Sequence, residues 1–477
     1  MPDSLKQKAA KGVLWSTVER FSVYGVQFVV MIVMARLLTP HDYGLVGMLA
    51  IFIAVAQSLI DSGFSQALIR KQDRTDVDNN TVFYFNIVVS ALLYLILYVS
   101  APFVADFYDT PQLCSVMRVV CLGIVFNSFA VVQRALLTIR IDFKTQAKAA
   151  LTAAAISGIV GIVMAWHGLG VWSLVVQQLL NLGVNTGLLW LLSKWRPRLV
   201  YSWLSFHELF AFGSKLLASG LLDTVYRNIY PIVIGKLFSA SSLGHYTRAH
   251  QFSEFPSSNV TGIIQRVTYP VLCEIQNDDV RLANIYRKFL KLSAFVIFPL
   301  MAGLAAVAEP FVNIMLGSQW GFCGQLLQVI CFSMMWYPVH SINLNLLQVK
   351  GRSDLFLRLE VIKKILGVAV LCVTAPFGLM VMCYGQIFSS LVSLVINTYY
   401  TGKLINVGFV RQMRDLLPTT ILCLIMFTLI LLVNHFIGND VVELCTGIVV
   451  GVVFYSLSSR VFKFSELDEL LSLIKRK

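Results

Sequence analysis

The chain has 477 residues, of which 57% are apolar and only 13% are charged, and its formal net charge is +13. Because about a quarter of the residues in a soluble domain are charged, this composition excludes an ordinary soluble protein. Stretches without Asp, Glu, Lys or Arg, such as residues 79–105 and 149–193, exceed the roughly 20 apolar residues that cross a bilayer as one helix. The sequence therefore predicts an all-α integral membrane protein.

In chain order, the apolar segments predict about 14 transmembrane helices. The first residues, MPDSLKQKAAKG, are polar, and no short apolar core with a small-residue cleavage site follows them, so no removable signal peptide is expected. The predicted spans cover residues 12–35, 43–66, 81–105, 112–136, 147–167, 170–193, 206–235, 242–265, 290–309, 322–348, 358–376, 379–402, 415–436 and 440–459.

The basic residues are distributed unevenly between the predicted loops. With the N-terminus in the cytoplasm, the inside loops contain groups of Lys and Arg, whereas the outside loops contain only Arg36 and Lys236. This asymmetry follows the positive-inside rule, so we expect both termini in the cytoplasm. The net charge therefore indicates membrane topology and not a nucleic-acid partner. Arg36 and Lys236 are expected to end their helices at the outer interface.

An internal repeat relates the two halves of the chain. ARLLTPHDYG at 35–44 corresponds to GKLFSASSLG at 235–244, residues 101–104 correspond to 309–312, and residues 136–140 correspond to 346–350. Because six spans separate the copies, both halves share one orientation, as in transporters built from parallel repeats. We therefore expect an N-terminal lobe at 1–200, a C-terminal lobe at 201–403, an extra helix pair at 404–460 and a cytoplasmic amphipathic tail at 461–477.

One predicted span is too polar for lipid. Residues 241–266 would be assigned to a loop by composition alone, but omitting this span would invert every later loop and place the basic groups outside. Such a helix must face protein or a water-filled cavity. Pro256 is expected to break or kink it.

Five segments together resemble a known family: ARLLTPHDYG, DSGFSQALIRK (61–71), LLTIRIDFK (136–144), LGHYTRAHQFSEFP (243–256) and LGSQW (316–320). They are similar to the polysaccharide exporters of the multidrug/oligosaccharidyl-lipid/polysaccharide (MOP) flippase superfamily, in the lipopolysaccharide, O-antigen, capsule and teichuronic-type branch. The resemblance implies a V-shaped bundle of two pseudo-symmetric six-helix lobes plus two C-terminal helices in the bacterial inner membrane. It also implies a cargo oligosaccharide on undecaprenyl diphosphate, which is flipped from the cytoplasmic to the periplasmic leaflet.

Charged residues inside the predicted spans are few, and they lean basic. Polar side chains recur on one face of the first span, and at every fourth residue in the seventh, from 215 to 227. Arginine suits an anionic diphosphate because its planar fork stays charged and donates to phosphate oxygens. The predicted cationic substrate site comprises Arg20, Arg118, Lys215, Arg227 and Arg248.

Structural alternatives for these charges remain open. Glu19 and Arg20 could extend to the interface, and so could Arg118. Asp223 and Arg227, four residues apart, could be a neutralised pair that only stabilises the helix. Asp61 could cap or hinge the second span, or it could couple an ion. The candidates for coupling or charge pairing are Glu19, Asp61, Asp223, His250 and Glu254, where His250 and Glu254 form either a proton-coupling pair or a structural pair.

The expected partners are the lipid-linked glycan and the bilayer. The tail has one apolar face, formed by Phe464, Leu467, Leu471 and Ile474, which predicts a helix lying on the inner leaflet. Docking of this tail to a glycosyltransferase or polymerase of the same pathway is the alternative.

No cofactor is expected, and coupling to Na⁺ or H⁺ stays open. The nine cysteines form no C-x-x-C pair, so neither a metal site nor a disulfide framework is indicated. The chain contains no Walker P-loop, H-E-x-x-H or G-x-S-x-G motif and its outside loops are short, which argues against an enzyme such as a membrane-embedded glycan polymerase or transferase. A lipid II flippase and a cation-coupled multidrug exporter remain alternatives within the superfamily.

Overall fold

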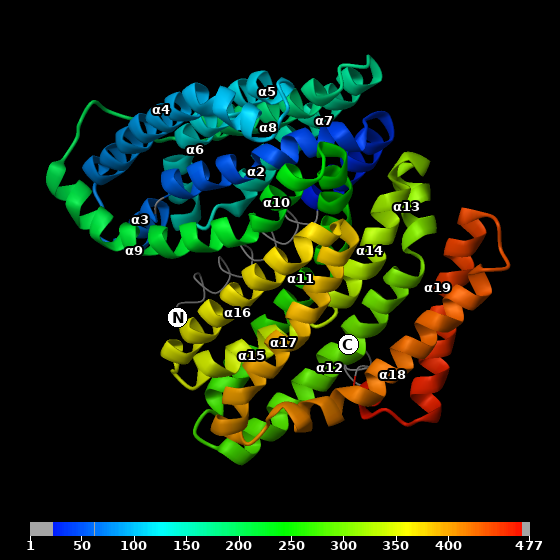
Figure 1. The fold of residues 1–477 in the computed structure, drawn as a ribbon. Coiled ribbons are helices and arrows are strands. Elements are labelled where there is room, and N and C mark those ends of the chain that lie inside the picture. Colours follow the sequence, from blue (N-terminus) through cyan, green and yellow to red (C-terminus); the bar gives the residue numbers. More distant parts are fainter. Residues whose placement is uncertain (1–21, 62, 470–477) are drawn as a thin grey trace. The chain divides into compact units, whose positions relative to one another are not determined.

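The computed structural model describes residues 22–61 and 63–469, and over these ranges it contains helices and no strands (Figure 1). Ten helical segments within these ranges are long and apolar enough to cross a membrane. The prediction of an all-helical membrane protein is confirmed at this level. The chain divides at Gly244 into two compact units, which are described separately; the predicted repeat boundary at residue 200 stays a prediction.

The first unit contains the helices that precede Gly244. Predicted spans that appear as one helix in the sequence are in several cases two helices in the structure, joined by one residue, as at Cys121 and Asn228. The elements are a helix at Ser22–Leu37, α2 (Pro40–Asp61), α3 (Phe64–Arg70), α4 (Asp76–Phe107), α5 (Gln112–Val120), α6 (Leu122–Ile139), α7 (Phe143–Trp166), α8 (Val171–Leu192), α9 (Trp203–Arg227) and α10 (Ile229–Leu237).

Small side chains determine how α7 packs along α8 (Figure 1). The buried face of α7 consists of Ala, Ser and Gly residues. A Cβ at Gly161 would lie 3.0 Å from Gln177 of α8, and one at Gly158 would lie 2.4 Å from Val30 of the first helix. Because lipid tails are as apolar as leucine, close van der Waals packing of this kind is what associates helices in a membrane.

The starts of α2 and α11 (Ala240–Glu274) have the same local structure two hundred residues apart. The hydroxyl of Thr39, just before α2, accepts a hydrogen bond from the backbone N–H of Asp42 at 3.3 Å. The hydroxyl of Ser239, just before α11, accepts one from the N–H of Ser242 at 3.1 Å. Both hydroxyls satisfy a first-turn donor that the helix itself leaves without a partner.

Glycines at matched positions let these two helix starts touch. A Cβ added to Gly44 would lie 1.6 Å from the carbonyl oxygen of Ala240, and one added to Gly244 would lie 1.9 Å from that of Pro40. Each glycine therefore packs against the first residue of the other helix. The repeated stretch at 35–44 and 235–244 thus encodes a reciprocal contact between two backbones.

The second unit contains the remaining helices. Among them, α12 packs along α18, and α18 packs along α19 (Figure 1). The elements are the body of α11, α12 (Asp279–Ala306), α13 (Ala308–Leu316), η1 (Ser318–Trp320), α14 (Gly321–Met334), α15 (Tyr337–Val349), α16 (Ser353–Thr374), η2 (Ala375–Phe377), α17 (Leu379–Ile405), α18 (Phe409–Asn434) and α19 (Asp440–Val461).

The polar segment 241–266 is helical, as predicted, and α11 continues through Pro256, so that of the two expected effects of this proline the break is wrong and the kink stays a prediction. Hydroxyls on one face of α11 form hydrogen bonds within the helix and to α14. Ser257 donates to the carbonyl of Met334 in α14 at 2.8 Å, and Thr261 and Thr268 donate to carbonyls one turn earlier at 2.7 Å. A transmembrane helix tolerates proline where neighbouring helices and Ser/Thr side chains satisfy the local polar groups.

The α11 helix is not among the ten apolar segments, nor are Ser22–Leu37, α9 and α16. The count of about 14 spans stays a prediction for these four helices.

Candidate functional site

Two of the predicted site residues lie outside the described residues, and a third is described only by its backbone. Glu19 and Arg20 precede residue 22. Lys215 lies within α9 at the predicted place in the four-residue series. The proposed roles of these three residues stay predictions.

Asp223 and Arg227 form the ion pair that their spacing on α9 predicts. Nε of Arg227 donates to Oδ2 of Asp223 at 2.7 Å, and the side chains are 70% and 47% exposed. A pair this open contributes only about 0.3–0.5 kcal/mol to stability. The geometry therefore agrees with the structural alternative, and a role of Arg227 in binding substrate stays a prediction.

Arg118 of α5 packs against α4. Its guanidinium carbon lies 4.5 Å from the centre of the Tyr98 ring, and Nε donates to the carbonyl of Tyr98 at 3.5 Å. The hydroxyl of Tyr94 donates to the carbonyl of Arg118 at 3.2 Å. These contacts agree with the alternative in which Arg118 is anchored near the end of its span.

Asp61 is the last residue of α2 and is exposed. It lies within electrostatic reach of Arg134 in α6, a cation that the sequence analysis did not single out. Gly63, two residues later, has φ = 70°, a left-handed conformation that glycine adopts readily. The end of α2 thus carries a carboxylate that interacts electrostatically with the half-buried Arg134.

The remaining charged candidates lie on α11 in the second unit. Nδ1 of His250 lies 3.5 Å from Oε2 of Glu254, so the predicted pair forms. A guanidinium nitrogen of Arg248 donates to Oε1 of Gln251 at 2.5 Å. The three candidates therefore follow one another within two turns of the polar helix.

Lys236 and Asp109 meet at the outer end predicted for α10. Nζ of Lys236 lies 2.9 Å from Oδ2 of Asp109 and 5.2 Å from the ring centre of Phe107. This lysine contacts the loop after α4, which agrees with a role in ending its helix at the interface.

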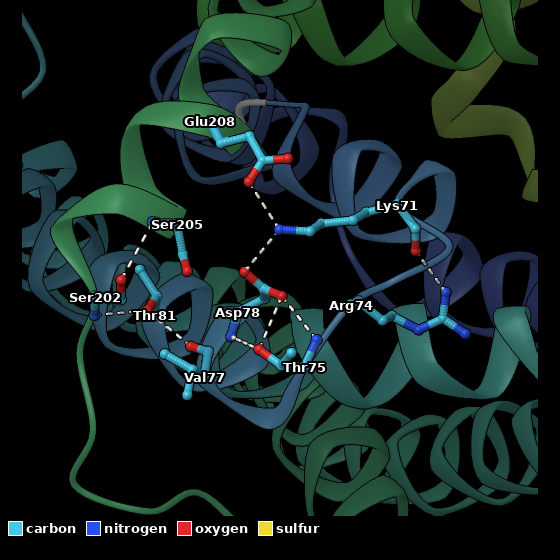
Figure 2. Close-up of polar contacts among 9 residues, drawn as sticks. All are labelled: Lys71, Arg74, Thr75, Val77, Asp78, Thr81, Ser202, Ser205 and Glu208. Carbon is cyan, nitrogen blue, oxygen red and sulfur yellow. Dashed lines mark hydrogen bonds and ion pairs between the residues drawn. The ribbon is translucent and has the colours of Figure 1, made fainter.

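A lysine that the sequence analysis missed connects three segments of the first unit (Figure 2). Nζ of Lys71, just after α3, lies 3.2 Å from Oδ1 of Asp78 and 2.8 Å from Oε2 of Glu208 in α9. Asp78 is 2% exposed and forms a capping box with Thr75 at the start of α4. The hydrogen bond to Glu208 raises the pKa of Lys71 above its ordinary value.

The same cluster fastens the start of α9 to the start of α4 (Figure 2). The backbone N–H of Ser202 donates to Oγ1 of Thr81 at 3.1 Å, and the Ser202 hydroxyl caps α9 by accepting from the N–H of Ser205. The T-x-x-D spacing at 75–78 is a sequence signal for the α4 cap. No local spacing connects Lys71 with a residue 137 positions away.

A second feature that the sequence analysis missed is a buried network of side-chain hydrogen bonds around Gln412 in the second unit. The side-chain amide of Gln412 in α18 exchanges two hydrogen bonds of 3.0 Å with Asn343 of α15. Its nitrogen also donates to Thr401 of α17 at 3.1 Å and to the carbonyl of Val407 at 3.0 Å. One glutamine thus ties together three helices.

His340 lies in the same unit as a neutral group. Its Nδ1 is 3.1 Å from the amide nitrogen of Asn397, and its Nε2 is 3.0 Å from the hydroxyl of Ser390. Because an amide nitrogen only donates, the orientation of the Asn397 side chain corresponds to the tautomer in which Nδ1 accepts and Nε2 carries the proton. Within residues 22–61 and 63–469, no group of three or more His, Cys, Asp or Glu side chains has metal-ligand proximity.

Comparisons with known proteins extend over most of the chain. Residues 33–325 match the model of a family described as polysaccharide biosynthesis protein. The teichuronic acid biosynthesis protein TuaB of Bacillus subtilis is 25% identical over 463 residues, 95% of each chain. The succinoglycan biosynthesis transport protein ExoT of Rhizobium meliloti is 22% identical over 472 residues, 98% of this chain and 95% of the relative. Among solved structures, the inward closed lipid II flippase MurJ has a TM-score of 0.72 at 15% identity, covering 94% of this chain and 99% of that one, which shows a shared fold.

Proposed function

Because the chain belongs to the polysaccharide biosynthesis protein family, we propose that it is a flippase for an oligosaccharide linked to undecaprenyl diphosphate. Membership of this family, with the flippase fold, makes the chain a multi-pass membrane transporter of polysaccharide biosynthesis and not an enzyme. The cargo is a lipopolysaccharide O-antigen, capsule or similar repeat unit, and it moves from the cytoplasmic to the periplasmic leaflet. The observation that carries this proposal is the near full-length similarity to proteins named for teichuronic acid and succinoglycan biosynthesis.

The proposed mechanism is alternating access between two six-helix lobes in a 14-span, V-shaped bundle with both termini in the cytoplasm. The diphosphate binds the cationic residues of the spans, the glycan occupies the wet space between the lobes, and the polyprenyl chain stays in lipid. Rocking of one lobe against the other then exposes the headgroup to the opposite side. The cations proposed to bind the diphosphate are Arg20, Arg118, Lys215, Arg227 and Arg248.

Ion coupling belongs to the same proposal as an open choice between Na⁺, H⁺ and neither. Asp61 faces Arg134 and His250 faces Glu254. Each of these two carboxylates would therefore change its local ion pairing if it bound a cation or a proton. Glu19 and Asp223 complete the set of candidates for this role.

The test is reconstitution of the purified protein in vesicles with a defined undecaprenyl-diphosphate oligosaccharide in one leaflet. A lectin or glycosidase outside the vesicle then reports the fraction of glycan that has crossed. Arg248→Ala should abolish transport with folded protein still present, and Arg248→Lys should restore part of it, because the ammonium keeps the charge but loses the two-pronged contact. Gln348→Leu, at an exposed site on α15, is the control.

Two outcomes would contradict the proposal. Transport of lipid II in place of the oligosaccharide would show that the chain is a lipid II flippase, the alternative within the same superfamily. Full transport by both Arg248→Ala and Arg227→Gln would show that the cargo is selected by its glycan or its lipid and not by its diphosphate.

A further inference from the structure

In the second unit, a pocket that none of the candidate site residues lines lies between α12, α18 and the segment that follows α19. Its volume is about 500 Å³, within the range of small-molecule sites. A smaller cavity adjoins it, since Lys291, Ser465 and Glu466 line both. Apart from Lys291, every residue that lines the pocket lies beyond residue 325, where the match to the family model ends.

The helix α12 supplies one basic residue, Lys291, to the wall of this pocket. Arg287 and Lys288 line the adjoining cavity together with Lys291. Arg287 binds both oxygens of Asp415 in α18 at 2.6 Å, whereas Lys291 lies 3.6 Å from the same carboxylate. Because Arg287 takes the carboxylate with a two-pronged contact, the ammonium of Lys291 keeps donors for another acceptor.

The segment after α19 supplies the second cation. Lys463 adopts φ = 52°, where a residue with a side chain is uncommon and glycine is the usual choice at the end of a helix. The backbone N–H of Phe464 donates to the carbonyl of Ser459 at 3.0 Å, and the Phe464 ring lies tilted at 5.9 Å from that of Phe295 in α12. Lys463 lies on the pocket wall.

The same segment supplies a carboxylate with no ion pair among the described residues. Glu466 is 9% exposed, lines both cavities, and accepts a hydrogen bond from Ser465 at 3.3 Å. Burying a carboxylate without a cation is costly, so a ligand ammonium would be favourable there. Two carboxylates thus line the pocket: Asp415, which is held by Arg287 and Lys291, and Glu466, which has no ion pair among the described residues.

The third wall is apolar and opens toward the lipid-facing surface. Pro418, Ile421, Leu422 and Ile425 lie on one face of α18. Ile421 and Ile425 are 47% and 49% exposed, and so they belong both to the pocket and to the outer surface of a transmembrane helix. An acyl chain can follow this surface while its headgroup occupies the pocket.

We propose that this pocket binds a membrane aminophospholipid. Its phosphate lies against Lys291 and Lys463, its ammonium against Glu466, and one acyl chain along Ile421 and Ile425. A phosphate beside a primary ammonium is the headgroup of phosphatidylethanolamine, whereas phosphatidylglycerol has the phosphate alone. Basic pockets between transmembrane helices on the cytoplasmic side are typical sites for lipid headgroups, and all three segments meet at the end with the basic loops.

The experiment is native mass spectrometry of the full-length, delipidated protein titrated with dioleoyl phosphatidylethanolamine or dioleoyl phosphatidylglycerol. Glu466→Gln, which keeps the side-chain shape, should weaken phosphatidylethanolamine binding by about tenfold and leave phosphatidylglycerol unchanged. Lys463→Gln should weaken both lipids. The controls are Glu443→Gln at the far end of α19 and Lys194→Gln in the first unit, which should change neither.

Three results would overturn the proposal. One is equal binding of phosphatidylethanolamine by the wild type and Glu466→Gln. Another is saturable binding of free phosphoethanolamine as tight as that of the lipid, which would assign the pocket to a soluble phosphate compound. The third is lipid binding only after truncation following Glu469, which would show that the chain's own end occupies the pocket. Transport of the lipid-linked glycan, measured separately, does not decide between these results.

Discussion

The reciprocal glycine contact at the starts of α2 and α11 gives a prediction with a defined size. In Gly44→Ala, the new methyl group would lie 1.6 Å from the carbonyl oxygen of Ala240, and an ordinary contact needs at least 3.4 Å. The two helix starts must therefore separate by about 1.8 Å, the difference between these two distances. No rotamer change relieves the clash, because the obstructing atom belongs to the backbone.

The cost follows from the same geometry. Inserting a methyl group into a close-packed contact typically costs about 1–3 kcal/mol, and replacing glycine by alanine inside a helix returns about 0.5–1 kcal/mol. We expect Gly44→Ala and Gly244→Ala each to lower the melting temperature of the purified protein by several degrees. Gly187→Ala in α8 is the matched control, because its Cβ would meet no atom within 4 Å. This control should be neutral or stabilising.

The double variant makes the reasoning refutable. Both clashes separate the same two helix starts, so the second substitution should cost less than it does alone, giving a coupling energy of at least about 0.5 kcal/mol. The assay is thermal unfolding in one detergent at one scan rate, followed by tryptophan fluorescence. Strict additivity, or single variants as stable as Gly187→Ala, would show that the two starts do not touch as described.

Three further predictions concern other contacts. Lys71→Met should lower stability by roughly 1–3 kcal/mol, because it leaves the buried Asp78 without its cation; Lys194→Gln is the control, and an equal effect of both would contradict this role. Folding raises the pKa of Lys71. The stability that Lys71 contributes should therefore be constant below its unfolded pKa of about 10.4 and should be lost as the pH rises through the higher pKa of the folded state. A loss of wild-type stability that begins at neutral pH would have another origin. Gln412→Leu removes four hydrogen bonds and should cost roughly 2 kcal/mol at about 0.6 kcal/mol for each in a membrane, compared with no loss for the exposed Gln348→Leu in the same melting assay. For topology, Gln319→Cys should react with an impermeant thiol reagent in intact cells and Gln72→Cys should not, and the reverse pattern would contradict the cytoplasmic placement of the termini.

Local sequence signals predicted the elements well, because spans and caps depend on residues close in the chain. The polar helix α11 was predicted from the repeat and the loop charges, although its own composition favours a loop. The helix α11 runs through Pro256 without a break. A proline removes one backbone hydrogen bond, and a transmembrane helix tolerates this loss where it packs against a neighbouring helix, as α11 does against α14 through Ser257 and Met334.

The charged residues show the same difference between contacts within one helix and contacts between helices. Asp223–Arg227 and His250–Glu254 form pairs because residues four apart share one helix face. Lys71 and Gln412 could not be predicted, since their partners lie 137 and 69 residues away. Within a helix, spacing determines which side chains are neighbours, whereas between helices the packing determines them.

The repeated stretch itself has a physical explanation in this contact. The two copies of the motif contact each other reciprocally. A side chain added to either helix start would therefore clash with the backbone of the other. A side chain at residue 44 cannot be accommodated by a change at residue 244, because the atom it would strike is the backbone of Ala240. Both glycines are therefore required at this contact, whereas the side chains of residues 40–43 and 240–243 differ at every position.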